Sequence, residues 1–205
     1  MSLVVILNNG SDIVIATDKR IIYTDVNDVV TRVDDNCRKM FFTPQQYVVT
    51  FNGDIGNQYV SIDKLIVDFI KKTTQYVSIN DYIIKLRDFI NTALLLTKST
   101  QLEASVQVSG INNYPMTKEL KIDTMEICDY NNQFILCGSY HTANEEVNKI
   151  CESPEYINGE LNMNVDYMKR LAGELIRISS KKEKGKYDVC PISSDYDLAI
   201  ISSQN

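Results

Sequence analysis

A β-hairpin at the start of the chain limits the folds that the rest of the sequence can adopt. Residues 3–7 and 12–16 are β-rich runs, and Asn8-Asn9-Gly10-Ser11 separates them. Asn-Gly between two such runs is the strongest short-range signal for a hairpin. We therefore predict that the chain opens with two paired strands built from its own N-terminus.

Blocks of strands and helices follow the hairpin. A helical spacing of apolar residues begins at Tyr59, and a second helix begins near Ser78, where Ser78-x-x-Asp81 resembles a capping box. The other predicted strands cover residues 26–33, 37–42, 47–51, 102–110, 120–128, 133–137, 187–192 and 196–202. The predicted helices cover residues 59–70, the stretch from residue 78 to 94, 144–151 and 165–178.

This order of elements indicates the fold class. Five strands, two helices, three strands, two helices and two strands do not alternate as in a doubly wound parallel sheet. They fit an α+β fold, a four-layer αββα sandwich with two mainly antiparallel sheets between helical layers. A chain of 205 residues can bury one large core, and no linker or repeat divides it. We expect a single domain over residues 1–205.

Composition narrows the location and the partners of the protein. The five cysteines form no C-x-x-C pair, which is typical of reduced, mostly buried thiols in a cytoplasmic protein. Residues 1–7 lack the basic region and cleavage site of a signal peptide, and no segment has the apolar length of a membrane span. A formal net charge of -6 opposes phosphate backbones and acidic membranes. We expect neither nucleic acid nor a membrane as partner.

Few residues suggest chemistry by themselves. The motifs GxGxxG, Walker A, HExxH and GxSxG are absent. The single histidine, His141, follows a predicted strand with Ser139 two residues earlier, a pattern that more often holds a structural histidine than a Ser-His hydrolase site. Asp18 and Arg20 close a buried run, where charges need partners. An ion pair between these two residues is the simplest interpretation of that cluster.

The stretch from Ser2 to Arg20 resembles the opening of proteasome β-subunits and their bacterial relatives, which are N-terminal-nucleophile (Ntn) hydrolases. In that family a threonine or serine becomes the first residue after processing. An aspartate follows sixteen residues later in an (S/T)-D-x-R segment. Ser2 and Asp18 have that separation (18 − 2), and residues 17–20 read Thr-Asp-Lys-Arg.

Later segments resemble the family in the same order. Residues 37–41 are similar to its R-K-M segment, which provides a lysine, here Lys39. The interval from Asp18 is several residues longer than is usual, and a turn at residues 34–36 can absorb the excess. Gly53 stands at the place of the glycine whose N–H forms the oxyanion hole. The R-K-M form favours the bacterial subtype.

The C-terminal half continues the resemblance with one departure. Ser139 ends a segment that resembles the family's G-S element, and Asp188 lies in a segment that resembles the first strand of its closing pair. The family often has a serine three residues after that aspartate. Pro191 occupies this position, which leaves Ser193 or Ser194 as substitutes.

The resemblance implies roles for these residues. The Ser2 hydroxyl is the nucleophile, and its own α-amine is the base, so activity requires removal of Met1. Lys39, paired with Asp18, activates the hydroxyl, and the Gly53 N–H stabilises the oxyanion. The supporting residues are Arg20, Ser139 and Asp188. No metal or organic cofactor is implied.

Two functions stay open at this point. The first is a serine/threonine-type peptidase or amidase of the proteasome type, acting on a peptide or protein. The second is a non-catalytic proteasome-like ring or scaffold subunit that binds partners. A different amide hydrolase on the same fold and a Ser139-His141 hydrolase are further alternatives. The resemblance also implies a homo-oligomer, as a ring or stacked array, and an unfoldase ATPase partner by analogy.

Overall fold

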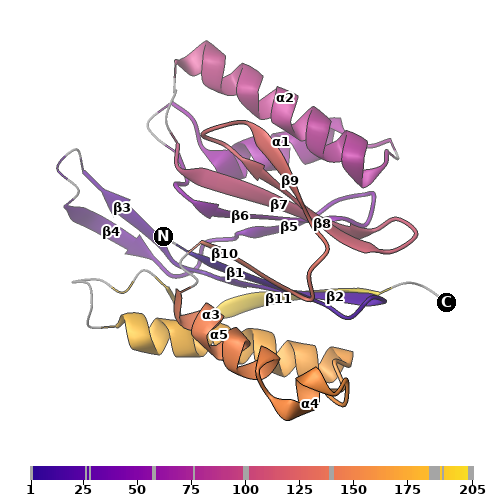
Figure 1. Ribbon diagram of the computed structural model, residues 1–205. Helices are drawn as coiled ribbons and strands as arrows, with labels where there is room; N and C mark the ends of the chain where they lie inside the picture. Colours follow the sequence, from indigo (N-terminus) through magenta and orange to yellow (C-terminus); the bar gives the residue numbers. More distant parts are fainter. Residues whose placement is uncertain are drawn as a thin grey trace. The chain divides into compact units, whose positions relative to one another are not determined.

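The computed structural model of the chain (Figure 1) describes residues 2–25, 27, 29–56, 59–75, 77–98, 102–138, 141–184, 190 and 192–202. The chain divides into two compact units. The first unit is Met1–Cys37 with Asn132–Ile200, and the second is Arg38–Asn131 with Ile201–Asn205. The single-domain prediction stays a prediction.

The first unit contains a four-stranded sheet in the order β10-β1-β2-β11, and β1 runs antiparallel to β2 and β10. A separate two-stranded ribbon pairs β3 with β4. The strands of this unit are β1 (Leu3–Asn8), β2 (Asp12–Asp18), β3 (Ile21–Thr24), β4 (Val30–Asp34), β10 (Phe134–Gly138) and β11 (Tyr196–Ser202). Its helices are α3 (His141–Cys151), α4 (Pro154–Ile157) and α5 (Val165–Glu183).

Strand β1 lies at the centre of the first unit's core. All residues from Leu3 to Leu7 are 0% exposed. Alternate side chains of β1 and β2 pack on one face of the sheet against the apolar sides of α3 and α5. The members of this cluster on the sheet are Leu3, Val5, Leu7, Val14 and Ala16, and those on the helices are Ala143, Val147, Met168, Leu171, Ala172, Leu175 and Ile176. The first strand is thus held from both neighbouring strands and from the helical layer.

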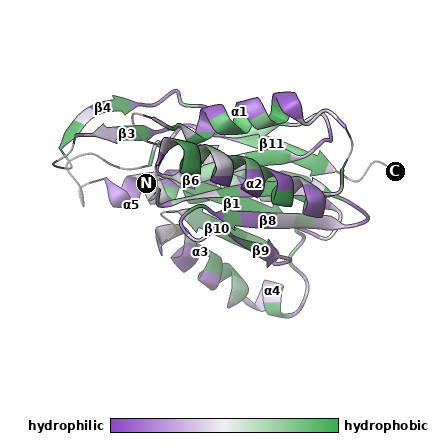
Figure 2. Ribbon diagram, turned by 90° about the horizontal axis from the view of Figure 1, so that it is seen from above, coloured by the Kyte–Doolittle hydropathy of each residue, from purple (hydrophilic) through white to green (hydrophobic). Residues whose placement is uncertain are grey.

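The second unit contains a five-stranded antiparallel sheet in the order β5-β6-β7-β8-β9. Its strands are β5 (Met40–Phe42), β6 (Val48–Gly53), β7 (Ala104–Ile111), β8 (Pro115–Lys121) and β9 (Glu126–Tyr130). Its helices are α1 (Ile62–Lys72) and α2 (Ile79–Thr97), along which hydrophobic and hydrophilic residues alternate in Figure 2. Tyr47 joins helix and sheet, because its ring contacts the Tyr82 ring at 5.5 Å and fills the space that Gly110 leaves without a Cβ.

A buried polar network lies on the other face of the second sheet. Gln107, which is 0% exposed, donates from Nε2 to Asn52 Oδ1 at 2.9 Å and to Glu119 Oε1 at 3.0 Å. Ser105 and Tyr130 donate their hydroxyls to the two oxygens of the Glu119 carboxyl at 2.7 and 2.8 Å. Such donors replace the water that a buried carboxylate loses. The polar residues on this face therefore form a satisfied network.

The predicted hairpin and the second helix are confirmed. Strands β1 and β2 pair antiparallel, and their turn is held by the Asn9 Oδ1 atom, which accepts the N–H groups of Ser11 and Asp12. The Ser78 side chain accepts the Asp81 N–H at 3.1 Å, as the capping box predicts. The final strand, residues 196–202, also has the predicted bounds.

Other boundaries were wrong. The predicted strand over residues 26–33 is replaced by β3 and β4, and that over residues 120–128 is two strands with a turn between them. The first helix begins at Ile62, which leaves Tyr59 outside it and 67% exposed. Helix α4 was not predicted. Of the predicted strand over residues 187–192, only residues 190 and 192 lie within the described residues.

The structure can be compared with the expectations about the cysteines and about membrane-spanning segments. All five cysteines are free thiols, but only Cys137 is fully buried, so the prediction of mostly buried thiols was wrong. No helix in the described part of the chain combines the length and apolarity that crossing a membrane requires.

Candidate active site

Ser2 lies directly before the central strand of the first unit and is 2% exposed. The two hydrogen-bonded ladders of β1 set its position. Leu3 is opposite Gly138 on β10, and Val4 is opposite Thr17 on β2. A residue at the end of a strand that is paired on both sides has little freedom to move. Ser2 therefore has a defined place in the fold, as an N-terminal nucleophile requires.

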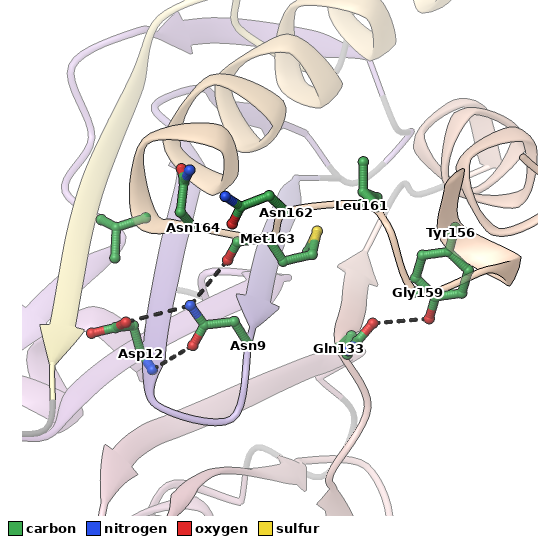
Figure 3. Close-up of a pocket in the computed structure, with 10 residues that line it drawn as sticks. Asn9, Asp12, Gln133, Tyr156, Gly159, Leu161, Asn162, Met163 and Asn164 are labelled. Atoms are coloured by element: carbon green, nitrogen blue, oxygen red, sulfur yellow. Dashed lines mark hydrogen bonds between the residues drawn. The ribbon is translucent and has the colours of Figure 1, made fainter. Parts of the chain in front are cut away.

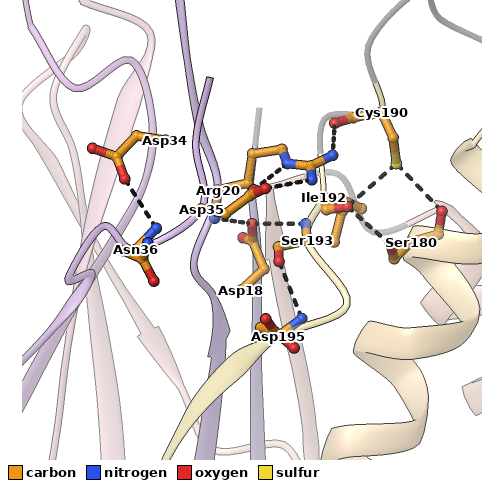
Figure 4. Close-up of polar contacts among 10 residues, drawn as sticks. All are labelled: Asp18, Arg20, Asp34, Asp35, Asn36, Ser180, Cys190, Ile192, Ser193 and Asp195. Atoms are coloured by element: carbon orange, nitrogen blue, oxygen red, sulfur yellow. Dashed lines mark hydrogen bonds and ion pairs between the residues drawn. The ribbon is translucent and has the colours of Figure 1, made fainter. Parts of the chain in front are cut away.

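Asp18 ends β2 beside the start of β1 and is 0% exposed. Its carboxyl accepts three backbone N–H groups from different segments, and Figure 4 shows those from Arg20 and Ser193. The Leu3 N–H lies 2.8 Å from Oδ1, while the N–H groups of Arg20 and Ser193 lie 3.0 and 3.4 Å from Oδ2. Backbone N–H donors are how a protein satisfies a buried carboxylate. Asp18 thereby joins the N-terminal strand to the segment before β11.

The Arg20 side chain forms an ion pair with Asp35, which was not predicted, and it also interacts electrostatically with Asp18, the predicted partner. Arg20 Nε and Nη2 donate to the two carboxyl oxygens of Asp35 at 2.5 and 2.9 Å. These hydrogen bonds raise the pKa of Arg20 and lower that of Asp35, with burial acting in the opposite direction in each case. Arg20 Nη1 also donates to the Cys190 carbonyl at 2.8 Å. Arg20 thus connects the end of β2 to the Asp35 carboxyl and to the Cys190 backbone.

Lys39 and Gly53, the other predicted catalytic residues, belong to the second unit. Lys39 lies just before β5 and is 1% exposed, a burial that an ammonium group tolerates only with compensating partners. Gly53 ends β6 with φ +89°, and a Cβ there would lie 2.1 Å from the Glu103 carbonyl oxygen. The backbone thus requires glycine at position 53 for steric reasons alone, whatever its N–H does in a reaction.

The remaining predicted residues are divided between described and undescribed positions. Ser139, Asp188 and Pro191 lie outside the described residues. His141 is the first residue of α3. Of the two substitutes for the missing family serine, Ser193 is 3% exposed and binds Asp18 through its N–H, whereas Ser194 is exposed.

A cavity of about 760 Å³ also lies in the first unit, between the β1–β2 turn and the segment before α5 (Figure 3). It is lined by Asn9, Asp12, Gln133, Tyr156, Gly159, Leu161, Asn162, Met163, Asn164 and Val165. Most of its polar groups are neutral amides: Asn9 donates to the Asp12 carboxyl and to the Met163 carbonyl, and Gln133 accepts the Tyr156 hydroxyl. Burial raises the pKa of Tyr156, and no serine, cysteine, lysine or histidine is among the described lining residues. None of the predicted catalytic residues lines this cavity, so it is not the candidate active site.

Sequence reasoning missed Asp35 as part of the site. The signal was present in the long interval between Asp18 and Lys39, because the added turn contains two adjacent aspartates. The turn is tied back to β2 by the Cys37 N–H, which donates to the Lys19 carbonyl at 3.0 Å. A turn that carries acidic residues and lies close to an arginine is a place to expect an ion pair.

Comparison with solved structures supports the fold, whereas the two comparisons of sequence find no match. No protein-family model matches the chain, and no curated protein matches it. Solved structures do match over 98% of the chain. Eukaryotic HslV from Trypanosoma brucei is 13% identical with a TM-score of 0.65, and 99% of that chain is covered.

Two Anbu (ancestral beta-subunit) structures are similar as well. Anbu from Yersinia bercovieri is 11% identical with a TM-score of 0.69, and the Anbu (Gly-1) mutant from Hyphomicrobium sp. strain MC1 is 10% identical with a TM-score of 0.70. In each case 82% of that chain is covered. The full-length likeness confirms the predicted α+β, proteasome-like fold class.

Proposed function

We propose that the protein is an Ntn hydrolase of the proteasome type, which cleaves peptide or amide bonds with Ser2 after Met1 has been removed. The observation that carries this proposal is the place of Ser2 at the head of the buried central strand, next to the Leu3 N–H that the Asp18 carboxyl accepts at 2.8 Å. The likeness in fold to HslV and Anbu supports the same class.

The reaction follows from the chemistry of an N-terminal serine. As Ser2 Oγ attacks the carbonyl carbon, the neutral α-amine of the same residue takes its proton. The tetrahedral oxyanion collapses, the C–N bond breaks, and the proton passes to the leaving amine. Water then hydrolyses the ester, which releases the acid and restores Ser2. An α-amine has an ordinary pKa of about 7.7–8.0 and is therefore partly neutral near pH 7.

The other roles rest on the resemblance. Lys39 and Asp18 provide the charge balance for the hydroxyl. The Gly53 N–H is the oxyanion donor, and such a donor lowers the barrier by about 3 kcal/mol in typical acyl-transfer enzymes. Ser139 and Asp188 support the amine. Replacing Lys39 by methionine keeps the length of the buried side chain and removes its charge. This variant should fold and lose activity.

The test is to measure the intact mass of the protein from its own host and to label it with an inhibitor that needs the hydroxyl and the free α-amine of one residue. We expect loss of the Met1 mass and one label on Ser2. Ser2→Ala abolishes labelling, Ser2→Thr retains it, and Ser11→Ala, in the exposed hairpin turn, is the matched control. A protein that keeps Met1 and takes no label contradicts the hydrolase.

That outcome would favour the second candidate, a non-catalytic ring or scaffold subunit. One exposed apolar surface supports this candidate. Helix α2 exposes Ile84, Leu95 and Leu96 by 42%, 67% and 80%. Ile84 and Leu95 lie eleven positions apart (95 − 84), close to three helical turns, and so share a face. We propose that copies of the chain cover this face in a homo-oligomer, which Leu95→Glu should dissociate in a native mass measurement. An unfoldase ATPase partner is proposed from the resemblance alone.

A further inference from the structure

Residues 190 and 192–195 contact the end of β2 and the two residues after it at three points, and Figure 4 shows the contacts of Cys190 and Ser193. The Cys190 carbonyl accepts from Arg20 at 2.8 Å, and the Ser193 N–H donates to Asp18 at 3.4 Å. The Lys19 N–H donates to the Asp195 carbonyl at 3.2 Å. This segment thus delivers one of the three N–H donors of the Asp18 carboxyl.

The Ser193 donor is the one most easily lost. At 3.4 Å it is longer than the bonds from Leu3 and Arg20, and near the upper limit for a hydrogen bond. The donor from Leu3 comes from the sheet that contains Asp18, and the donor from Arg20 lies only two positions after Asp18. Ser193 is instead 175 positions away and precedes its own strand. A small movement of Ser193 removes its hydrogen bond.

Arg20 is one of the side chains that hold this segment, together with Ser180, whose hydroxyl donates to the Ile192 carbonyl at 2.9 Å, and Asp35 orients Arg20. The guanidinium is planar, and two of its N–H groups meet the Asp35 carboxyl in a fork while a third reaches the Cys190 carbonyl. A guanidinium bound in this way has one orientation. Without Asp35, two of the hydrogen bonds that orient the guanidinium are lost, and Arg20, which is already 20% exposed, can turn further toward solvent.

We propose that Asp35 is a positioning residue for the Ser2 site, acting through Arg20 and Cys190 to help keep Ser193 on the Asp18 carboxyl. The inference deepens the proposed hydrolase and rests on it for the catalytic consequence. The coupling of Asp35 to the Ser193 contact does not depend on whether the protein is an active hydrolase. Asp35 lies in the turn that lengthens the interval between Asp18 and Lys39, so the added residues supply the clamp.

The first arm of the test needs no substrate. Hydrogen exchange is followed by mass spectrometry over residues 17–20 and 192–196 in the full chain. Asp35→Asn should speed the exchange of these segments by up to about fivefold, as expected when a partly exposed ion pair worth up to about 1 kcal/mol is lost. Asp34→Asn is the matched control, because the Asp34 carboxyl binds Arg32 and the Asn36 N–H instead. Equal exchange in the two variants overturns the inference.

The second arm separates positioning from mere stability. Asp35→Asn should lower kcat about tenfold with little change in KM, and Asp35→Glu, which restores the charge, should recover most of it. In an Arg20→Gln background, Asp35→Asn should have no further effect, because Asp35 acts through Arg20. Additive effects of the two substitutions overturn the inference. An inactive wild-type protein refutes the hydrolase but leaves the exchange test decisive for the clamp.

Discussion

Replacing Asp18 by asparagine removes one acceptor and the charge from a buried group while leaving its size unchanged. Asparagine has one oxygen, so it can accept from Leu3 or from the pair formed by Arg20 and Ser193, but not from both sides. Its NH2 group then faces an N–H donor. With the oxygen turned to the pair, the Leu3 N–H is left buried without its acceptor, next to a side chain that is 0% exposed.

The cost can be worked from these contacts. A buried donor left without an acceptor costs about 1–3 kcal/mol, and two charge-assisted bonds that become neutral lose roughly 1 kcal/mol more. We expect Asp18→Asn to lower the free energy of unfolding by about 2–4 kcal/mol. For a chain of this size this corresponds to a fall in Tm of roughly 5–15 °C.

The measurement is urea denaturation of the purified protein at pH 7, with linear extrapolation to water. Asp12→Asn is the control, because Asp12 begins the same strand and its carboxyl accepts only a 3.4 Å bond from Asn9 among the described residues. It should stay within about 0.5 kcal/mol of the wild type. An Asp18→Asn variant as stable as Asp12→Asn would refute the view that Asp18 joins three segments.

Three further predictions concern other sites. Tyr82→Phe should raise the free energy of unfolding by about 1 kcal/mol in the same denaturation assay, because the buried Tyr82 hydroxyl has no hydrogen-bond partner among the described residues; a destabilised variant contradicts this. Gly53→Ala should cost at least about 2 kcal/mol, since positive φ and the Glu103 carbonyl oxygen both exclude a Cβ; a neutral result means that the turn relaxes. Arg20 lowers the pKa of Asp35, so the stability that this pair adds is present above the ordinary carboxyl pKa and is lost as the pH falls through the lowered value. The difference in stability between wild type and Asp35→Asn should therefore be below about 1 kcal/mol at pH 7, given the exposure of Asp35, and should vanish in acid.

Local signals predicted those elements whose causes are local. The Asn-Gly turn and the Ser78 cap act within four residues, so they can be read from the sequence. The strand predicted over residues 120–128 shows the opposite case. Its β-rich residues are interrupted by a turn that contains no glycine or proline and places Met125 at φ 55°. Nothing in the composition of that run marks the reversal.

The sequence suggested candidate site residues but not their contacts. The resemblance to a family spacing pointed to Ser2 and Asp18, but the acceptor role of Asp18 depends on partners 15 and 175 positions away. The pairing of Arg20 with Asp35 depends on how the turn after β4 folds back. Tertiary distances of this kind decide which carboxyl an arginine meets, and sequence spacing does not report them.

The pairing of β1 also has a consequence for the order in which the protein is made. Leu3 meets Gly138, which lies 135 positions later (138 − 3), and Asp18 meets Ser193 later still. Most of the second unit is one continuous stretch between those partners. On the ribosome, the strand that carries Ser2 must therefore wait, with one edge unpaired, until most of the chain has emerged. A truncated chain cannot present a finished nucleophile, so synthesis itself delays the proposed hydrolase until its fold is complete.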